Sequence, residues 1–176
     1  GRPRHGRGPG RRAATRSLVI LADTSAWVEF DRATGSDVHL RLRELIASGR
    51  IKPTRTVNET VAFHDSCYLG RYNDIYDAPR ETLRRALPVV NLVEPPRTKD
   101  RGLCCGAGGG RMFMEERIGK RINVERVEEL LAAGADAIAV ACPFCMTMMV
   151  DGTRAKGSDV AVQDIAEVVA GRLQSL

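Results

Sequence analysis

The chain has 176 residues, enough for one domain or for one domain with an additional segment. Apolar residues make up 43% of it and charged residues 28%, which are the proportions of a soluble globular protein. The net charge of +5 is local, because residues 1–16 hold six arginines and no acidic residue, so the remaining chain carries +5 − 6 = −1.

No apolar run approaches the ~20 residues that a membrane-spanning helix needs. The longest runs, 18–22 and 137–141, have the length of strands. The first of them follows Arg11-Arg12 but is too short for the apolar part of an export signal, and Asp23 ends it, so we expect no signal peptide. We expect a cytoplasmic protein, either free or peripheral to a membrane complex.

Residues 1–17 are rich in Gly and Arg and have no apolar periodicity. This composition predicts a disordered basic tail. Such a tail could contact phosphates of RNA or DNA without sequence specificity. We favour a solvated extension, since one charged run is weak evidence for nucleic-acid binding.

Residues 18–50 form a second predicted unit, with a strand over 18–22 and a helix over 37–48 that Gly49 ends. The motif at 23–27, DTSAW, resembles the start of a PIN-domain toxin ribonuclease. The resemblance implies that Asp23 helps to bind a catalytic Mg²⁺ or Mn²⁺, which needs further carboxylates. This resemblance ends near residue 51, as in a fusion or a misassembled reading frame. We therefore favour a helix-capping role for Asp23.

Residues 51–176 alternate between predicted strands and helices. Strands are expected at 61–63, 89–93, 137–141 and 160–162, and helices at 79–87, 113–133 and 163–173. The continuous apolar run at 137–141 is typical of a strand buried on both faces. The alternation predicts an α/β fold with a parallel, Rossmann-like sheet.

All five cysteines fall in this part of the chain, in the pattern C-x36-CC-x36-CxxC: Cys67, Cys104, Cys105, Cys142 and Cys145. An odd number of cysteines fits a disulfide framework poorly and in a cytosolic protein indicates metal binding or catalysis. Each group follows a predicted strand or its region. Since sites in open parallel sheets form at the carboxyl ends of strands, we expect the thiols to meet at that edge.

Three motifs surround these cysteines: FHDSCYLGR at 63–71, CCGAGGG at 104–110 and ACPFC at 141–145. Together they resemble the cysteine-rich CCG domain of heterodisulfide reductases and of iron–sulfur subunits of glycolate oxidase, anaerobic glycerol-3-phosphate dehydrogenase and lactate-utilisation proteins. The resemblance covers about residues 57–172. It implies an iron–sulfur oxidoreductase or electron-transfer module that reduces a disulfide or relays electrons in a dehydrogenase complex.

Soft thiolate ligands select iron–sulfur clusters, Zn²⁺ or Cu(I). A structural zinc site and an ordinary cubane cluster each use four thiolates, and this chain has five. The family resemblance implies a noncubane [4Fe-4S] cluster. A structural or regulatory zinc module that uses four of the thiols is one alternative, and a fragmentary PIN-type Mg²⁺-dependent ribonuclease is another.

Other residues beside the cysteines are candidates for the site. His64 and Asp65 are candidate catalytic residues that hydrogen-bond cluster sulfur or deliver protons, the alternative being a turn residue and a local cap. Gly106, Gly108 and Gly109 are candidates for cofactor binding, because glycines allow close approach of the backbone. The dinucleotide-binding glycine spacing is absent.

Partners are expected, because the chain has a single CCG motif where family members often carry two copies of the domain. It also lacks the CxxCxxC ferredoxin motif that would supply electrons. We expect an electron-donor or dehydrogenase subunit, and a second CCG domain or a ferredoxin-like subunit. Nucleic acid is expected only as a contact of the basic tail.

Overall fold

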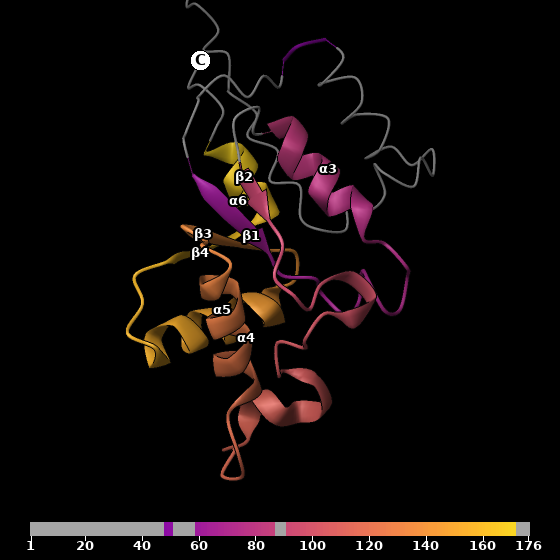
Figure 1. Ribbon diagram of the computed structural model, residues 1–176. Helices are drawn as coiled ribbons and strands as arrows, with labels where there is room; N and C mark the ends of the chain where they lie inside the picture. Colours follow the sequence, from indigo (N-terminus) through magenta and orange to yellow (C-terminus); the bar gives the residue numbers. More distant parts are fainter. Residues whose placement is uncertain (1–47, 51–58, 87–90, 172–176) are drawn as a thin grey trace, which may run out of the picture.

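The computed structural model describes residues 48–50, 59–86 and 91–171. The predicted tail over 1–17, and the predicted unit over 18–50 except for its last three residues, lie outside the described residues. The described part contains a sheet of four parallel strands in the order β2-β1-β3-β4 (Figure 1). The strands are β1 (Thr60–Phe63), β2 (Asn91–Val93), β3 (Ala137–Val140) and β4 (Ala161–Asp164). The predicted α/β fold is confirmed.

Helices cover both faces of this sheet. Helices α4 (Ile122–Ala132) and α5 (Pro143–Ala155) pack on one face, and α3 (Asp77–Ala86) and α6 (Ile165–Ala170) pack on the other (Figure 1). The two cores follow the alternation of side chains along a strand. Val61 and Phe63 of β1 face α3 and α6, whereas Ala62 faces α4 and α5.

The central strand β3 is buried along its whole length, as its apolar run predicts. Ala137 and Ala139 belong to the core under α3 and α6, and Ile138 and Val140 to the core under α4 and α5. A parallel strand between two neighbours has its backbone polar groups satisfied within the sheet. The strand therefore provides a rigid base from which Cys142 leaves the sheet.

The expected helix over 113–133 is wrong in its first part, since α4 begins only at Ile122. Residues 108–113 form short 3-10 turns that Gly109 and Gly110 interrupt with positive φ angles of 66° and 76°. The next segment carries charges rather than an apolar stripe, and its Ile118 is 96% exposed. This segment therefore has no apolar face that could pack on the core. Such packing is what stabilises most helices in proteins.

Several other boundaries differ by one to a few residues from those expected. Helix α3 begins at Asp77 rather than Pro79, which still lies in the first turn, where a missing N–H costs nothing. Strand β4 runs over Ala161–Asp164, so α6 begins at Ile165 instead of 163. Residues 87–90 and 172–176, which hold parts of the expected strand and helix, lie outside the described residues.

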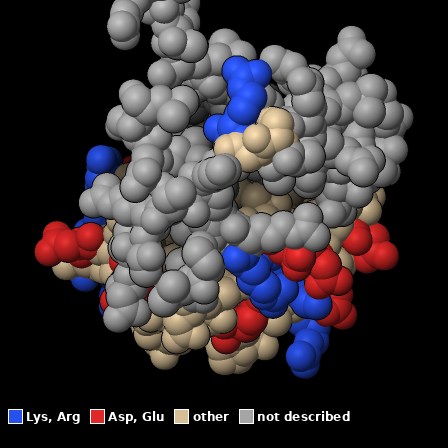
Figure 2. All heavy atoms as spheres, turned by 90° about the horizontal axis from the view of Figure 1, so that it is seen from above, with Lys and Arg blue, Asp and Glu red and all other residues tan. Residues whose placement is uncertain are grey.

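The described surface carries charges of both signs. On the face seen in Figure 2, several described Lys and Arg side chains lie beside Asp and Glu side chains, and another basic side chain lies beside uncharged residues. In the described ranges, no helix is both long and apolar enough to cross a lipid bilayer.

Gly152 lies where α5 crosses α4, and its replacement by Ala tests this packing. A Cβ there would lie 2.7 Å from Val127 Cγ2 and 2.9 Å from the Asn123 carbonyl oxygen, so the helices would have to move apart. We expect Gly152→Ala to lower the free energy of unfolding by about 1–3 kcal/mol, measured by urea denaturation. Arg154→Ala, an exposed position on the same helix, is the control and should change it little. An equally stable Gly152→Ala protein would contradict this packing.

Candidate metal centre

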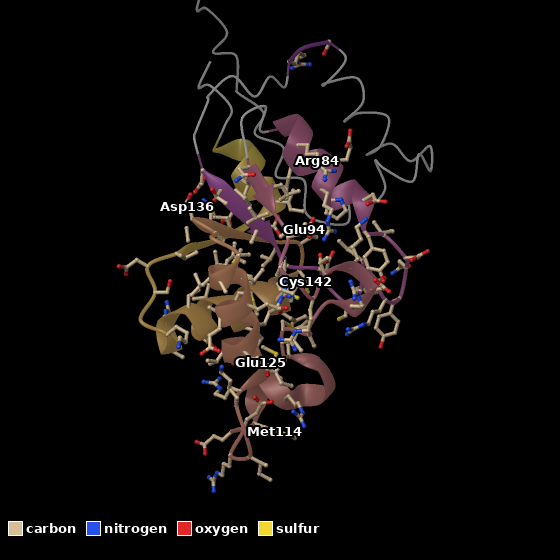
Figure 3. The ribbon with its side chains drawn as sticks, viewed as in Figure 1. Arg84, Glu94, Met114, Glu125, Asp136 and Cys142 are labelled. Carbon is tan, nitrogen blue, oxygen red and sulfur yellow. The ribbon has the colours of Figure 1, made fainter. Side chains whose placement is uncertain are left out.

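Three chain segments leave the sheet at its carboxyl edge: one follows β1, one follows β2 and one follows β3. Figure 3 shows Cys142 at this end of the sheet, whereas Asp136 lies at the opposite end of β3. The segments carry the five cysteines that the sequence motifs single out. All five are free thiols, with Cys105 and Cys145 buried and the other three half-buried.

The first segment follows β1. The His64 N–H donates to the Ala139 carbonyl at 2.9 Å, which extends the pairing of β1 with β3 by one residue. The chain then turns tightly around Cys67, where the Gly70 N–H donates to the Ser66 carbonyl at 2.9 Å. A Cβ at position 70 would collide with the Tyr76 ring, since it would lie 2.5 Å from Cε1. Gly70 therefore allows this turn to pack beside the site.

The second segment carries the adjacent cysteines. Its approach is tied to the first segment, because the Arg71 guanidinium donates to the Gly102 carbonyl. Gly106 has a φ of +90°, which favours glycine, and its N–H donates to Cys104 Sγ at 3.3 Å. A Cβ at Gly106 would lie 3.2 Å from Ile122 Cβ. This glycine lets the chain turn back directly behind the two thiols.

The third segment is the CxxC motif at the start of α5. Cys142 is the extended N-cap residue, Pro143 occupies the first turn and Cys145 points inward from it. Cys142 Sγ interacts with the backbone N–H groups of Phe144 and Cys145. Free N–H groups at a helix start favour a negative sulfur.

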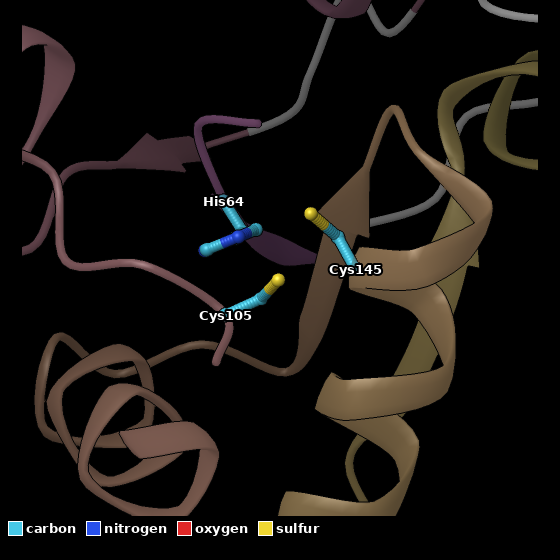
Figure 4. Close-up of side chains that lie close together, drawn as sticks. All are labelled: His64, Cys105 and Cys145. Carbon is cyan, nitrogen blue, oxygen red and sulfur yellow. The ribbon is translucent and has the colours of Figure 1, made fainter. Parts of the chain in front are cut away.

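The structure brings the five thiols together. Cys67, Cys104, Cys105 and Cys145 line one pocket, and Cys142 lies close enough to Cys145 for the two thiols to shift each other's pKa. The ligand atoms of His64, Cys105 and Cys145 all lie within 4.8 Å of one another, and Figure 4 shows the three side chains converging from separate elements. Donor atoms that are mostly sulfur fit a soft metal centre.

The thiols divide their protons unequally. Hydrogen bonds from the Cys104 and Cys145 thiols lower the pKa of Cys105 far below its ordinary value. The same bonds raise the pKa of Cys104 and Cys145, since each holds its proton against Cys105. The hydrogen bond from Cys145 and the two backbone N–H groups lower the pKa of Cys142 to about 6. Negative charge therefore collects on sulfur before any metal is bound.

Asp65 lies at the edge of the pocket, in an ion pair with the buried Arg80. The two guanidinium nitrogens donate to its oxygens at 2.7 and 2.9 Å, and the Lys99 N–H donates at 2.8 Å. Burial would raise the pKa of Asp65, but these hydrogen bonds outweigh burial and hold the pKa below its usual range. Glu94 also binds Arg80, at 2.6 Å. Arg80 thus joins α3, the loop after β1 and the end of β2.

His64 is buried beside the thiols, and burial lowers its pKa. Its Nδ1 accepts a hydrogen bond of 3.1 Å from Nε of Arg126, an α4 residue with no exposed surface. Neither Arg80 nor Arg126 was expected from the sequence. A signal for Arg126 existed, because it lies four residues before the buried Leu130 and so on the apolar face of its helix.

The predicted glycines occupy different surroundings. Gly106 is buried directly behind the paired cysteines, whereas Gly108 and Gly109 are exposed, with no atom within 4 Å of a Cβ position. The methionines near the cysteine motifs also differ in burial. Met148 and Met149 are core residues, but Met114 is 65% exposed on a segment that extends away from Cys142 (Figure 3). Cofactor binding by the three glycines, and catalysis by His64 and Asp65, stay predictions.

Comparison with known proteins identifies similar sequences. The model of a family described as CCG, cysteine-rich domain, matches residues 61–150. The probable iron–sulfur-binding oxidoreductase FadF of Bacillus subtilis is 51% identical over 131 residues, covering 73% of this chain and 18% of that protein. The EtfAB:quinone oxidoreductase of Syntrophomonas wolfei is 41% identical over 137 residues, covering 73% of this chain and 19% of that protein.

A third relative comes from Methanosarcina barkeri. It is a subunit of the dihydromethanophenazine:CoB–CoM heterodisulfide reductase and is 36% identical over 156 residues, covering 85% of this chain and 38% of that protein. The chain thus spans from about a fifth to about two fifths of the length of these three relatives. None of the three names mentions zinc.

The reactivity of Cys142 tests the charge distribution among the thiols. Because the pKa of Cys142 is lowered to about 6, the alkylation rate in the metal-free protein should rise through pH 6 and level off near pH 7. Mass spectrometry after brief treatment with iodoacetamide measures the labelling of each cysteine. A rate for Cys142 that keeps rising to pH 9, as for an ordinary thiol, would contradict this environment.

Removing the charge of Asp65 tests its pairing with Arg80. We expect Asp65→Asn to lower the free energy of unfolding at pH 7 by about 3 kcal/mol, since Glu94 still binds the buried guanidinium. The lowered pKa stabilises the fold above the unfolded carboxyl's pKa of about 3.9, and the loss should shrink as pH falls below it. Asp77→Asn, an exposed partner of Lys99, is the control. Unchanged stability would favour a purely chemical role for Asp65.

Proposed function

Since this chain belongs to the family of cysteine-rich CCG domains, we propose that its five thiols hold an iron–sulfur cluster and that it serves as an electron-transfer module of an oxidoreductase. The observation that supports this most directly is the convergence of the five cysteines from three separate segments. Such a convergence places several sulfurs in contact, and a bound cation offsets the repulsion between those that lose their protons.

The donor set fits iron–sulfur chemistry. Cys67, Cys104, Cys105, Cys142 and Cys145 are the proposed ligands, one more than a cubane cluster or a zinc site uses. Five thiolates suit a noncubane [4Fe-4S] cluster, the type that the family resemblance implies. When bound, such a cluster accepts and donates one electron at a time. The iron–sulfur name of the FadF relative supports this choice over zinc.

The protein's own groups prepare the site for the negative charge of the ligands. Backbone N–H groups of Gly106, Phe144 and Cys145 approach the sulfurs. Hydrogen bonds to cluster sulfurs help to set reduction potentials. The nearby carboxylate of Asp65 adds little repulsion, because Arg80 binds both of its oxygens.

An electron-transfer module needs an electron donor and an electron acceptor, so partner subunits or further domains are part of the proposal. The three relatives are far longer than the part that this chain matches. We propose an electron-donor or dehydrogenase subunit as partner, with a second CCG domain or a ferredoxin-like unit beside it. If the substrate is a disulfide, two electrons from the donor and two protons would convert it into two thiols. The other proposed use of the same site is to relay electrons in a dehydrogenase complex.

Anaerobic reconstitution with iron and sulfide tests the proposal. We expect a brown protein with iron and acid-labile sulfide in equal amounts, and loss of both in Cys105→Ala, whose side chain is central among the thiols. Thr147→Ala, exposed on α5, is the control and should retain the cluster. Circular dichroism checks that each variant is folded. A colourless protein with stoichiometric zinc and no sulfide would overturn the proposal.

A further inference from the structure

His64 lies between a buried guanidinium and two of the thiols. Only 1% of its surface is exposed, and Nδ1 lies 3.1 Å from Nε of Arg126. One ring nitrogen lies within 4.8 Å of the sulfurs of Cys105 and Cys145. Figure 4 shows the imidazole at the end of β1, facing both sulfurs. By distance alone, His64 is a candidate ligand for the metal.

The direction of the hydrogen bond from Arg126 argues against His64 as a metal ligand. A guanidinium has five N–H donors and no acceptor, so Nδ1 of His64 must present its lone pair to Arg126. A neutral imidazole carries one proton, which is then on Nε2. Metal binding through Nε2 would require that proton on Nδ1, where it would point at the N–H group of Arg126.

Arg126 is itself firmly held. Its Nη1 donates to the Arg97 carbonyl at 2.7 Å and to Glu129 Oε2 at 2.8 Å. The side chain has no exposed surface, so no water competes for the bond to His64. These contacts fix the guanidinium against Nδ1, and the contact is therefore part of the packed interior rather than an incidental surface approach.

The other ring nitrogen, Nε2, lacks a well-placed hydrogen-bond acceptor among the described residues. Nε2 of His64 is buried and completes no hydrogen bond of good geometry with them, while Cys105 lies near enough to interact with the imidazole. A buried donor without a partner is unfavourable, because it loses its hydrogen bond to water and gains none in the protein. A sulfur atom carrying negative charge is a suitable acceptor, and the sulfurs of Cys105 and Cys145 lie within 4.8 Å of one of the two ring nitrogens.

We propose that Arg126 is a positioning residue that fixes His64 as the Nε2–H tautomer, so that His64 donates a hydrogen bond to cysteine sulfur instead of binding metal. The inference rests on the proposed function only for its effect on the cluster. The reduced cluster carries one more negative charge, and an N–H donor stabilises it more than the oxidised form. His64 therefore raises the reduction potential.

The tautomer is measured in the full chain prepared anaerobically without metal. Nitrogen-15 NMR of histidine-labelled protein distinguishes a protonated from an unprotonated ring nitrogen, and a His64→Gln sample assigns the signals, since the chain has three histidines. We expect a protonated Nε2 and an unprotonated Nδ1. The reverse tautomer would overturn the proposal, whether or not the protein binds a cluster.

Two substitutions of Arg126 test its role. In Arg126→Gln the amide oxygen offers an acceptor and lets the tautomer reverse, whereas Arg126→Lys retains only donors. We expect the Gln variant to shift the redox equilibrium of the reconstituted cluster about tenfold toward oxidised, a fall of about 59 mV for one electron. The Lys variant should keep the parent potential.

The matched control is Arg154→Gln, which alters an exposed arginine in the last turn of α5, away from the cysteines at the start of that helix. It should change neither tautomer nor potential. Equal potentials for the parent and the Arg126→Gln protein would overturn the proposal. If the Gln variant does not fold, the parent's tautomer and the potential of His64→Leu, which we expect to fall, decide instead. Failure of the parent to assemble a cluster would contradict the proposed function and leave the tautomer measurement valid.

Discussion

The structure depends on holding five ionisable sulfurs in one place. Thiolates in contact repel each other, so the fold has to hold the segments that carry them in place. A parallel sheet does so because its strands all end at the same edge, so segments far apart in the sequence emerge side by side. The buried strand β3 and its neighbour β1 fix two of the three segments. The thiols then offset part of their charge by sharing protons around Cys105.

Two buried arginines complete the arrangement behind the thiols. Arg80 binds Asp65 and Glu94 and packs over the Phe63 ring, 5.2 Å from its centre. It thereby holds the loop that carries Cys67. Arg126 performs the same task for His64 from the opposite face of the sheet. Buried charges of this kind are costly unless they are paired, so their presence beside the thiols is best explained by the geometry they impose.

The sequence predicted the fold, because the alternation of strands and helices follows local patterns of apolar residues. It predicted the convergence of the thiols, because each cysteine group follows a strand or its region. The start of α4 was wrong, since the prediction extended the helix through a charged segment whose Ile118 has no core to pack on. Arg80 and Arg126 were not predicted, because their partners lie 15 and 62 residues away. Pairing over such separations leaves no mark on local composition, although the place of Arg126 on the apolar face of α4 is visible in the sequence. The tautomer of His64 likewise depends on Arg126 and follows only from the folded structure.

Iron K-edge X-ray absorption of the anaerobically reconstituted full chain tests the central claim most directly, because it reports the atoms around iron. We predict a first shell of sulfur alone, from sulfide and cysteine, with other iron atoms as the next neighbours. Nitrogen in the first shell that disappears in His64→Gln would place His64 among the ligands and contradict the role assigned to it. Iron without iron neighbours would contradict a cluster altogether.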